Sequence, residues 1–426
     1  MLIQRYRHRT LLLVVALFLA VPVLVVVGIA ALAWRPVIAA VTPPRSDAFN
    51  SATVRSGAHL AAVGNCSGCH TAAGGVPLAG GTPLQTPFGI VHGTNLTPDR
   101  DTGLGTWSFE AFARAMRDGV ARDGRQLYPA FPYDHFRNTT DADLRALYAF
   151  LMTRDPVRAE TPPNQLTFPL NWRALVAGWK LLYLRDRPAP VDRGDYLVQT
   201  LGHCGACHTP RNALGAENRN APLGGGRVEG WYAPPLNQAS PSPLPWTVEQ
   251  MTAYLRTGIA PDHAIAGGPM QGMVSQLAHA DEADVQAIAR YIVASMGTPD
   301  PGRATAAQAR AARPLAADAG DPQRALGAQV YETTCAVCHA LDRRQSSGSA
   351  LRLPLAIAVY DDDPRSFLRI VRDGVMPDPG SRGRWMPAFG GALTDEQLTA
   401  LAAFLRHAAA AQPPWPQLAQ AVKETG

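Results

Sequence analysis

Three copies of one pentapeptide constrain most strongly how this chain folds. The pattern Cys-x-x-Cys-His occurs at residues 66–70, 204–208 and 335–339. This spacing is the attachment signature of c-type haem. Two thiols on one helical turn reach the two vinyl groups of a single porphyrin, and the adjacent histidine lies under the iron. All six cysteines of the chain fall within these motifs. The sequence therefore predicts three covalently bound haem c groups.

Each motif assigns its residues a role. The predicted thioether residues are Cys66, Cys69, Cys204, Cys207, Cys335 and Cys338, and the predicted proximal iron ligands are His70, His208 and His339. A zinc site or a thiol redox pair is the alternative interpretation. Zinc would need two further ligands at each site, and a redox pair does not require the histidine. Three complete motifs with no spare cysteine favour haem.

The N-terminus has the pattern of a membrane anchor, which we place at residues 1–40. Arg5, Arg7 and Arg9 precede an uncharged apolar run from Leu11 to Trp34. The run is longer than the ~20 residues that span a bilayer. A cleaved signal is the alternative, since Ala31-Leu32-Ala33 fits a cleavage site. The positive-inside rule places everything after Arg35 on the outer face of the membrane, which suits haem c because its attachment takes place in the periplasm or its equivalent.

The remainder of the 426 residues repeats one plan three times. Each copy begins with a helix-like segment that carries a glycine (57, 194 or 327), continues with an amphipathic stretch ending in Arg-x-Gly, and closes with a capped helix. Small helices around a haem, without an alternating strand pattern, predict an all-α fold of three tandem cytochrome c domains behind an N-terminal transmembrane helix. We place these domains at 46–155, 191–297 and 321–412, with a linker at 156–190, a flexible linker at 298–320 and a C-terminal tail at 413–426.

The linker at 156–190 has an unusual apolar centre. It contains Phe168-Pro169-Leu170-Asn171-Trp172 and Gly178-Trp179-Lys180-Leu181-Leu182-Tyr183. A solvated linker would not carry so many aromatic residues. We expect this stretch to pack on a partner subunit or to lie at the membrane surface. The alternative is a helix that braces the first and second domains.

A cytochrome of this kind needs a second axial ligand, usually Met or His. Met270 and Met386 each stand twelve residues after the glycine of Arg-x-Gly, and this agreement selects them as distal ligands. Met273 is the alternative to Met270. The other methionines that we considered lie at apolar helical positions and are expected to be core residues: Met116, Met152, Met251 and Met296.

The first copy breaks this rule, because its twelfth residue is Phe131, which cannot coordinate iron. Three interpretations compete. His135, four residues further on, is the ligand; another side chain such as His92 swings in; or the iron has an open site. We assign His135, since it lies in the corresponding loop, and this assignment predicts a bis-His haem of lower potential than the Met-ligated ones.

Several further segments carry a family resemblance. They are Thr94-Asn95-Leu96-Thr97-Pro98-Asp99, Thr102-Gly103-Leu104-Gly105-Thr106-Trp107, Phe168-Pro169-Leu170-Asn171, Gly178-Trp179, Gly268-Pro269-Met270 and Met386-Pro387-Ala388-Phe389. Together with three haem motifs behind an apolar segment, they resemble the membrane-bound triple-haem cytochrome c subunits of bacterial periplasmic dehydrogenases. That family serves quinoprotein alcohol dehydrogenases, flavoprotein sugar and gluconate dehydrogenases, and molybdenum hydroxylases.

The loop around Phe131 resembles one branch of that family. Alcohol and sugar branches have a loop similar to Tyr-Pro-Ala-Met-Pro-Tyr, whereas residues 128–133 read Tyr-Pro-Ala-Phe-Pro-Tyr and are followed by a histidine at 135. This resembles the branch that is paired with molybdenum hydroxylases acting on aldehydes or N-heterocycles. The resemblance implies a molybdenum hydroxylase with an iron–sulfur subunit as partner, and ubiquinone or a terminal oxidase as acceptor.

The chain is expected to transfer electrons rather than to transform a substrate itself. It has no P-loop, no dinucleotide-binding fingerprint and no further cysteine for an iron–sulfur cluster. Its net charge of +5 includes the three N-terminal arginines and is too small to argue for nucleic acid. The first alternative is a cytochrome subunit of a quinoprotein alcohol dehydrogenase or of a flavoprotein sugar or gluconate dehydrogenase. Two others are a peroxidase that uses an open iron at the first haem, and a cytochrome module of a respiratory oxidase.

Overall fold

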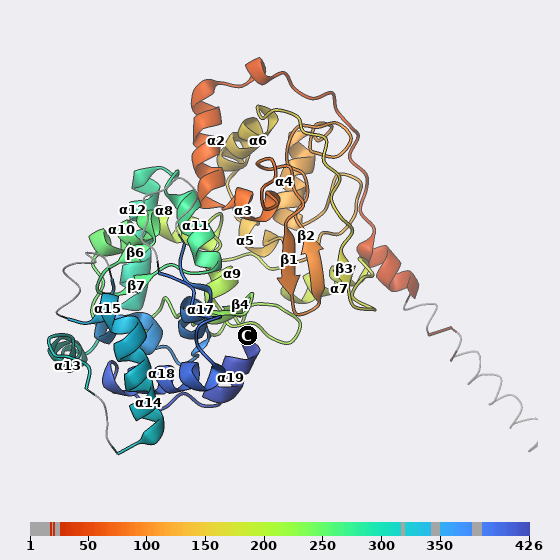
Figure 1. Cartoon of the computed structure of the whole chain (residues 1–426). Helices are drawn as coiled ribbons and strands as arrows, with labels where there is room; N and C mark the ends of the chain where they lie inside the picture. The colour runs from red at the N-terminus through yellow and green to blue at the C-terminus, as the bar shows by residue number, and fades with distance from the viewer. Residues whose placement is uncertain (1–17, 19, 22–25, 317–319, 342–349, 377–385) are drawn as a thin grey trace, which may run out of the picture. The chain divides into compact units, whose positions relative to one another are not determined.

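The computed structural model describes residues 18, 20–21, 26–316, 320–341, 350–376 and 386–426. These form two compact units, Met1–Gly57 with Cys69–Pro188, and Ala58–Gly68 with Ala189–Gly426. The first haem motif lies where the two units meet along the chain, and the second and third motifs belong to the second unit. Helices dominate, as the sequence predicts (Figure 1). Short antiparallel strands, which the sequence analysis did not anticipate, line some of the loops.

The first copy consists of short helices and one small sheet. Helices α2 and α3 run across the boundary between the units, and strands β1, β2 and β3 form an antiparallel sheet in that order. The elements are η1 (Ser46–Ala48), α2 (Ser51–Val63), α3 (Cys66–His70), β1 (Pro83–Thr86), β2 (Gly89–His92), α4 (Phe109–Asp118), α5 (Tyr133–Phe136), α6 (Asp141–Met152), β3 (Gln165–Leu166) and α7 (Leu175–Tyr183).

The second and third copies follow within one unit. Strands β4 and β5 form one hairpin, and β6 and β7 form another. The elements are α8 (Arg193–Gln199), α9 (Gly205–His208), β4 (Gly226–Val228), β5 (Trp231–Ala233), α10 (Val248–Thr257), β6 (Ile259–Ala260), β7 (Ala264–Ile265), α11 (Pro269–Leu277), α12 (Glu282–Met296), α13 (Pro301–Ala311), α14 (Pro322–Val330), η2 (Tyr331–Cys335), α15 (Ala336–His339), η3 (Leu353–Leu355), η4 (Ile357–Val359), α17 (Arg365–Asp373), α18 (Asp395–Ala408) and α19 (Leu418–Glu424).

The predicted membrane span from Leu11 to Trp34 includes residues 11–17, 19 and 22–25, which lie outside the described residues. Among the residues that are described, no helix has the length and apolar character needed to cross a membrane.

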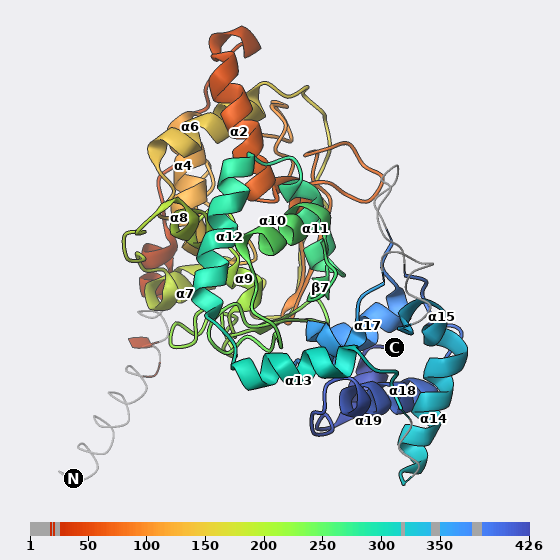
Figure 2. The same cartoon turned by 90° about the vertical axis from the view of Figure 1, so that its left-hand side faces the viewer.

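The glycine that opens each copy marks a close crossing with the closing helix. A Cβ atom on Gly57 would lie 1.9 Å from the carbonyl oxygen of Ala146, and one on Gly194 would lie 2.2 Å from that of Ala287. In the third copy, Gly327 meets Ala400 in the same way, at 2.0 Å. Figure 2 shows this third crossing, where α14 runs against α18. At each crossing the first helix lies directly on the backbone of the last.

The Arg-x-Gly motifs end their helices as predicted. Gly119, Gly258 and Gly374 follow α4, α10 and α17, and all three have positive φ angles of 61°, 76° and 71°. Left-handed backbone suits glycine because it has no Cβ.

The arginines of these motifs have a role that the sequence did not reveal. Arg117 donates to the carbonyl oxygen of Thr139 at 2.6 Å, and Arg372 to the carboxylate of Asp395 at 2.6 Å. Arg256 donates to the carbonyl oxygen of Ala278 at 3.2 Å. In every copy the arginine therefore reaches the start of the closing helix or the segment just before it.

Much of the segment at 298–320, expected to be a flexible linker, forms a packed helix instead. Residues Pro301–Ala311 form α13, whose Ala307 and Ala311 are buried against Leu244 and Leu355. Asp300 caps this helix by accepting from the backbone of Arg303. Alanine-rich sequence with an aspartate cap and proline in the first turn is a good helix former, and the small side chains give α13 a surface that packs closely.

The predicted C-terminal tail at 413–426 is also folded. Trp415, Leu418 and Val422 are buried in the core of the third copy. The indole of Trp415 donates to the carbonyl oxygen of Asp361 at 2.7 Å. These residues therefore pack as part of the third copy.

The linker at 156–190 packs on the first copy. In α7, Val176 and Ala177 are buried, and Lys180 donates to the carbonyl oxygens of Asp118 and Gly119 at 2.6 and 2.7 Å. The same segment carries large exposed apolar residues, namely Phe168, Leu170, Trp172, Leu181 and Leu182. The segment thus covers the end of α4 while it presents an apolar surface of its own.

Candidate haem sites

The three haem motifs lie on short helices. The cysteines of each motif are three residues apart: both lie on α3 in the first, at the N-cap and within α9 in the second, and on the joined turns of η2 and α15 in the third. None of the six forms a disulfide. In the first two motifs, a residue with positive φ precedes the first cysteine: Asn65 at 46° and His203 at 36°. In the third, α14 continues through a wider turn, η2, into the motif. The third copy therefore approaches its motif differently from the other two.

Each proximal histidine is oriented by a backbone carbonyl. The Nδ1 atom of His70 is 2.6 Å from the oxygen of Thr94, and that of His208 is 2.7 Å from the oxygen of Pro234. His339 lies 3.2 Å from the oxygen of Leu351. A carbonyl oxygen only accepts, so each Nδ1 carries the proton and donates. The tautomer is thereby fixed with Nε2 unprotonated, which is the atom that binds iron.

Burial supports the neutral form of these imidazoles. It lowers the pKa of His70 and of His208, although the hydrogen bonds to the backbone act in the opposite direction. Burial also raises the pKa of the Cys204 thiol to about 12 and that of Cys335 to about 11. A neutral imidazole is the state that iron requires, and buried uncharged sulfur suits a thioether.

Together these residues fit three haem c groups. Each site offers two thiols on one helical turn and a neutral histidine whose second nitrogen is held by the protein. A zinc site would need further ligands, and the cluster of potential metal ligands found among the described residues contains none of the six cysteines.

The predicted distal residues follow a recurring backbone pairing. Val120 pairs with Gln126 in the first copy, and Ile259 pairs with Ile265 in the second. Phe131 and Met270 each stand five residues beyond the second partner, so the structure places them at corresponding positions of their loops. Met270 itself lies at the start of α11.

In the third copy, the residue that pairs is Met386 itself. Its backbone exchanges two hydrogen bonds with Val375, at 2.9 and 3.0 Å, and its side chain packs against the core that also contacts Cys335. Twelve residues after the glycine of Arg-x-Gly, the third copy has therefore only reached the paired residue, whereas the first two copies are five residues beyond it. Met116, Met152, Met251 and Met296 are buried, which confirms the prediction that they are core residues.

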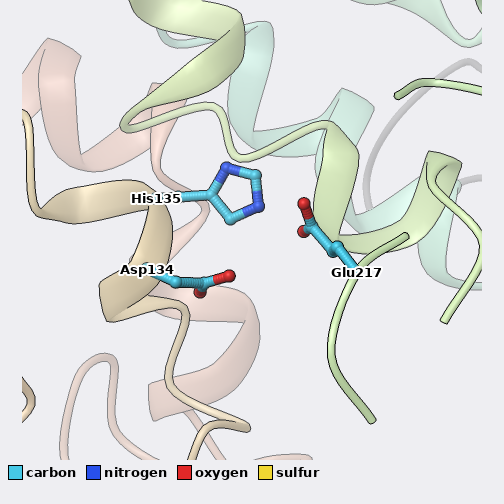
Figure 3. A group of neighbouring side chains, drawn as sticks. All are labelled: Asp134, His135 and Glu217. Carbon is cyan, nitrogen blue, oxygen red and sulfur yellow. The ribbon is translucent and has the colours of Figure 1, made fainter. Parts of the chain in front are cut away.

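His135 lies on the short helix α5 beside Asp134, as Figure 3 shows, and only 1% of its surface is exposed. Its Nε2 atom is 3.2 Å from Nη2 of Arg187. A guanidinium only donates, so Nε2 accepts with the same lone pair that iron would use. His135 can therefore bind iron through Nε2 only if this nitrogen gives up its bond to Arg187.

Phe131 packs in an aromatic group rather than against a polar partner. Its ring lies 5.3 Å from that of Phe136 and 6.3 Å from that of Tyr133. His92, the other histidine considered, belongs to the proximal side. The next residue, Gly93, lies against the carbonyl oxygen of Cys69, and Thr94 accepts from His70. A side chain on this strand is poorly placed to reach the opposite face of the same haem.

The sequence analysis missed the carbonyl acceptors and Arg187. Backbone acceptors leave no trace in side-chain identity, so no pattern could have located Thr94, Pro234 or Leu351. Arg187 lies in the linker, far along the chain from His135, and only the folded chain brings the two together.

Comparison with known proteins agrees with this geometry. Residues 54–155 and 191–295 match the Cytochrome c family. Residues 322–405 match the family described as Cytochrome C oxidase, cbb3-type, subunit III. The copy that matches a different family model is thus the one whose haem motif is preceded by the wider turn η2.

Several relatives that the chain covers over most of their length are cytochrome subunits of dehydrogenases. The gluconate 2-dehydrogenase cytochrome c subunit of Pantoea cypripedii is 36% identical, over 84% of this chain and 86% of the relative. The alcohol dehydrogenase (quinone) cytochrome c subunit of Gluconobacter oxydans is 32% identical, over 84% and 78%. A nicotinate dehydrogenase subunit of Pseudomonas putida is 45% identical over 91% of this chain, which spans only 33% of that relative's length.

Proposed function

The chain belongs to the family of dehydrogenase cytochrome c subunits, and we propose that it carries electrons from a molybdenum hydroxylase to ubiquinone or a terminal oxidase. We propose that this hydroxylase acts with an iron–sulfur subunit on an aldehyde or an N-heterocycle. Transfer of electrons within a dehydrogenase complex is the role of the family itself. The identity of the partner and of the acceptor is the proposal.

The observation that carries the choice of partner is the first distal loop. Phe131 stands where the second copy has Met270, five residues beyond the paired strands. The 45% identity to a nicotinate dehydrogenase subunit supports the same branch. Because the chain spans a third of that relative, its substrate is not carried over, and only the class of partner is proposed.

We propose one haem c at each motif, held by the paired cysteines and by His70, His208 and His339. When bound, each haem supplies one-electron chemistry at its iron. The protein fixes the neutral tautomer of each proximal histidine through a carbonyl acceptor. Met270 and Met386 are the proposed distal ligands in the second and third copies, and His135 is the proposed distal ligand in the first.

The domain boundaries and the location are also proposed. We retain haem domains at 46–155 and 191–297, and we extend the third to include 413–426, because Trp415 and α19 pack in its core. The basic N-terminus and the apolar run from Leu11 to Trp34 support an anchor that leaves the haem domains on the periplasmic side of the inner membrane.

Purification of the complex from membranes tests this proposal. The haem-containing fraction would be isolated in mild detergent, its polypeptides identified and its molybdenum measured. We expect a molybdenum hydroxylase and a small iron–sulfur subunit to co-elute in constant ratio with the haem absorbance. A quinoprotein or flavoprotein partner would preserve the electron-transfer role and refute the choice of branch. Peroxide-reactive high-spin iron in the isolated chain would instead favour a peroxidase.

A further inference from the structure

The hairpin formed by β4 and β5 contacts the proximal side of the second haem site. A Cβ atom on Gly226 would lie 2.4 Å from the carbonyl oxygen of Cys207, so β4 lies directly on the haem motif. Pro234, which follows β5, accepts the hydrogen bond that orients His208, at 2.7 Å. The hairpin turns tightly through Glu229 and Gly230, which both have positive φ angles, 49° and 78°.

The same hairpin also contacts the distal side of that site. The indole of Trp231 lies against the backbone that precedes Met270. A Cβ atom on Gly268 would fall 2.2 Å from Cε2 of the indole, and one on Gly267 would fall 3.0 Å from Cζ3. Gly268 has a positive φ of 52° and directly precedes Pro269, the first residue of α11. The indole therefore supports the loop from which Met270 is presented.

Strand β5 of the hairpin packs against α17 of the third copy (Figure 1). The hydroxyl of Ser366 donates to the carbonyl oxygen of Tyr232 at 2.6 Å and accepts from its backbone nitrogen at 3.1 Å. Arg227 forms an ion pair with the largely buried Asp363 at 2.8 Å. A Cβ atom on Gly267 would also lie 3.4 Å from Cγ1 of Ile370.

Helix α17 leads directly into the distal loop of the third site. It ends at Gly374, and the next residue, Val375, pairs with Met386. The nitrogen of Phe389 donates to the carbonyl oxygen of Val371 at 2.9 Å. A displacement of α17 would therefore be felt at both the hairpin and the segment that carries Met386.

We propose that the β4–β5 hairpin is a positioning element shared by the second and third haem sites, with Trp231 as its principal side chain. It holds both ligand-bearing segments of the second site and joins them to the helix that supports the third. The two sites consequently respond together, so that a change made on α17 alters the redox potential of the second haem. This inference rests on the proposed ligation by Met270.

Potentiometric titration of the full-length, haem-loaded chain tests the proposal. Met270→His first identifies the component that belongs to the second haem. Trp231→Ala is then compared with Trp231→Phe, and Ser366→Ala is compared with Thr399→Ala. The Thr399 hydroxyl donates to the carbonyl oxygen of Asp395 within its own helix, at 2.6 Å, so its loss removes a hydroxyl from the third copy without touching the hairpin.

We expect Trp231→Ala to shift the second component and to reduce the Met–iron charge-transfer band to about half, since one of two Met-ligated haems loses its ligand. Trp231→Phe should restore the band. Ser366→Ala should move the second component, and Thr399→Ala should not. If Trp231→Ala leaves the band intact, or Ser366→Ala moves only the third haem, the inference is wrong while the electron-transfer role stands. If Met270→His moves no component, the ligand assignment fails and the inference fails with it.

Discussion

Replacement of Gly194 by alanine should destabilise the second copy by about 1–2 kcal/mol. The added methyl would lie 2.2 Å from the oxygen of Ala287 and 2.9 Å from its carbonyl carbon. The obstructing atoms are backbone, so no side chain can rotate away, and α8 must move outward by about 1 Å to reach an ordinary contact. Overpacking of this kind costs about 1–3 kcal/mol or more, and the better helix propensity of alanine returns at most about 1 kcal/mol.

The displacement would also loosen a well-packed interface. Leu197 and Val198 on α8 and Val285 on α12 are at most 1% exposed. Guanidinium unfolding of the haem-loaded chain, followed by haem absorbance, gives the free energy of unfolding. Gly272→Ala is the matched control, because Gly272 lies in α11 of the same copy with no atom within 4 Å of the added carbon. If Gly194→Ala is no more destabilising than this control, the close crossing does not hold the domain together. Gly57→Ala and Gly327→Ala should repeat the result in the other copies.

Four further predictions concern single side chains. Burial lowers the pKa of His263 to about 4. In the unfolded chain this histidine is protonated below about pH 6.5, whereas in the folded chain it stays neutral down to about pH 4. The free energy of unfolding should therefore fall by roughly 3 kcal/mol as the pH falls from 6.5 towards 4. Denaturation of His263→Gln should not show this loss. Lys180→Met should cost about 1–3 kcal/mol by removing the donor to the carbonyl oxygens of Asp118 and Gly119 and to the side chain of Gln126, as measured by urea unfolding. His135→Ala should turn one haem in three high-spin in the absorption spectrum; an unchanged spectrum would exclude His135 as a ligand. Leu182→Cys should react with a charged maleimide more slowly than Val76→Cys when the chain is in lipid nanodiscs. The two native side chains are similarly exposed, 56% for Leu182 and 52% for Val76. Equal reaction rates would place the exposed apolar residues of 168–182 away from the bilayer.

Local chemistry made much of this molecule predictable. The haem motifs are defined by covalent spacing, the helix stops by glycine, and the closing helices by caps such as Thr394, whose hydroxyl accepts from the backbone of Gln397. These features depend on a few neighbouring residues. The alanine-rich segment at 301–311 was assigned to a linker because its composition suits both a linker and a helix, and only its contacts with Leu244 and Leu355 decide between them.

Non-local contacts set the limit of sequence reasoning at the haem sites. The hydrogen bonds of His70, His208 and His339 end on backbone oxygens, which any residue can provide. The partner of His135 is a linker arginine about fifty residues away. Counting residues from Arg-x-Gly selected equivalent loop positions in the first two copies but not in the third, where Met386 lies at the strand pairing itself. Counting residues along the sequence cannot detect such a change of loop geometry.

The three copies share their frame and differ in their distal loops. Each has the glycine crossing, the arginine that reaches towards the closing helix and the carbonyl that orients the proximal histidine. In the proposed ligation, the carbonyl acceptors would orient the proximal histidine of each haem in the same way and give the three irons similar proximal environments. The distal loops carry a phenylalanine and a methionine at corresponding positions in the first two copies, Phe131 and Met270, whereas Met386 stands at the paired residue itself. Since axial ligand identity is a principal determinant of haem potential, differences in potential among the three haems should originate in these loops, and exchange of a distal loop between copies should transfer the potential with it.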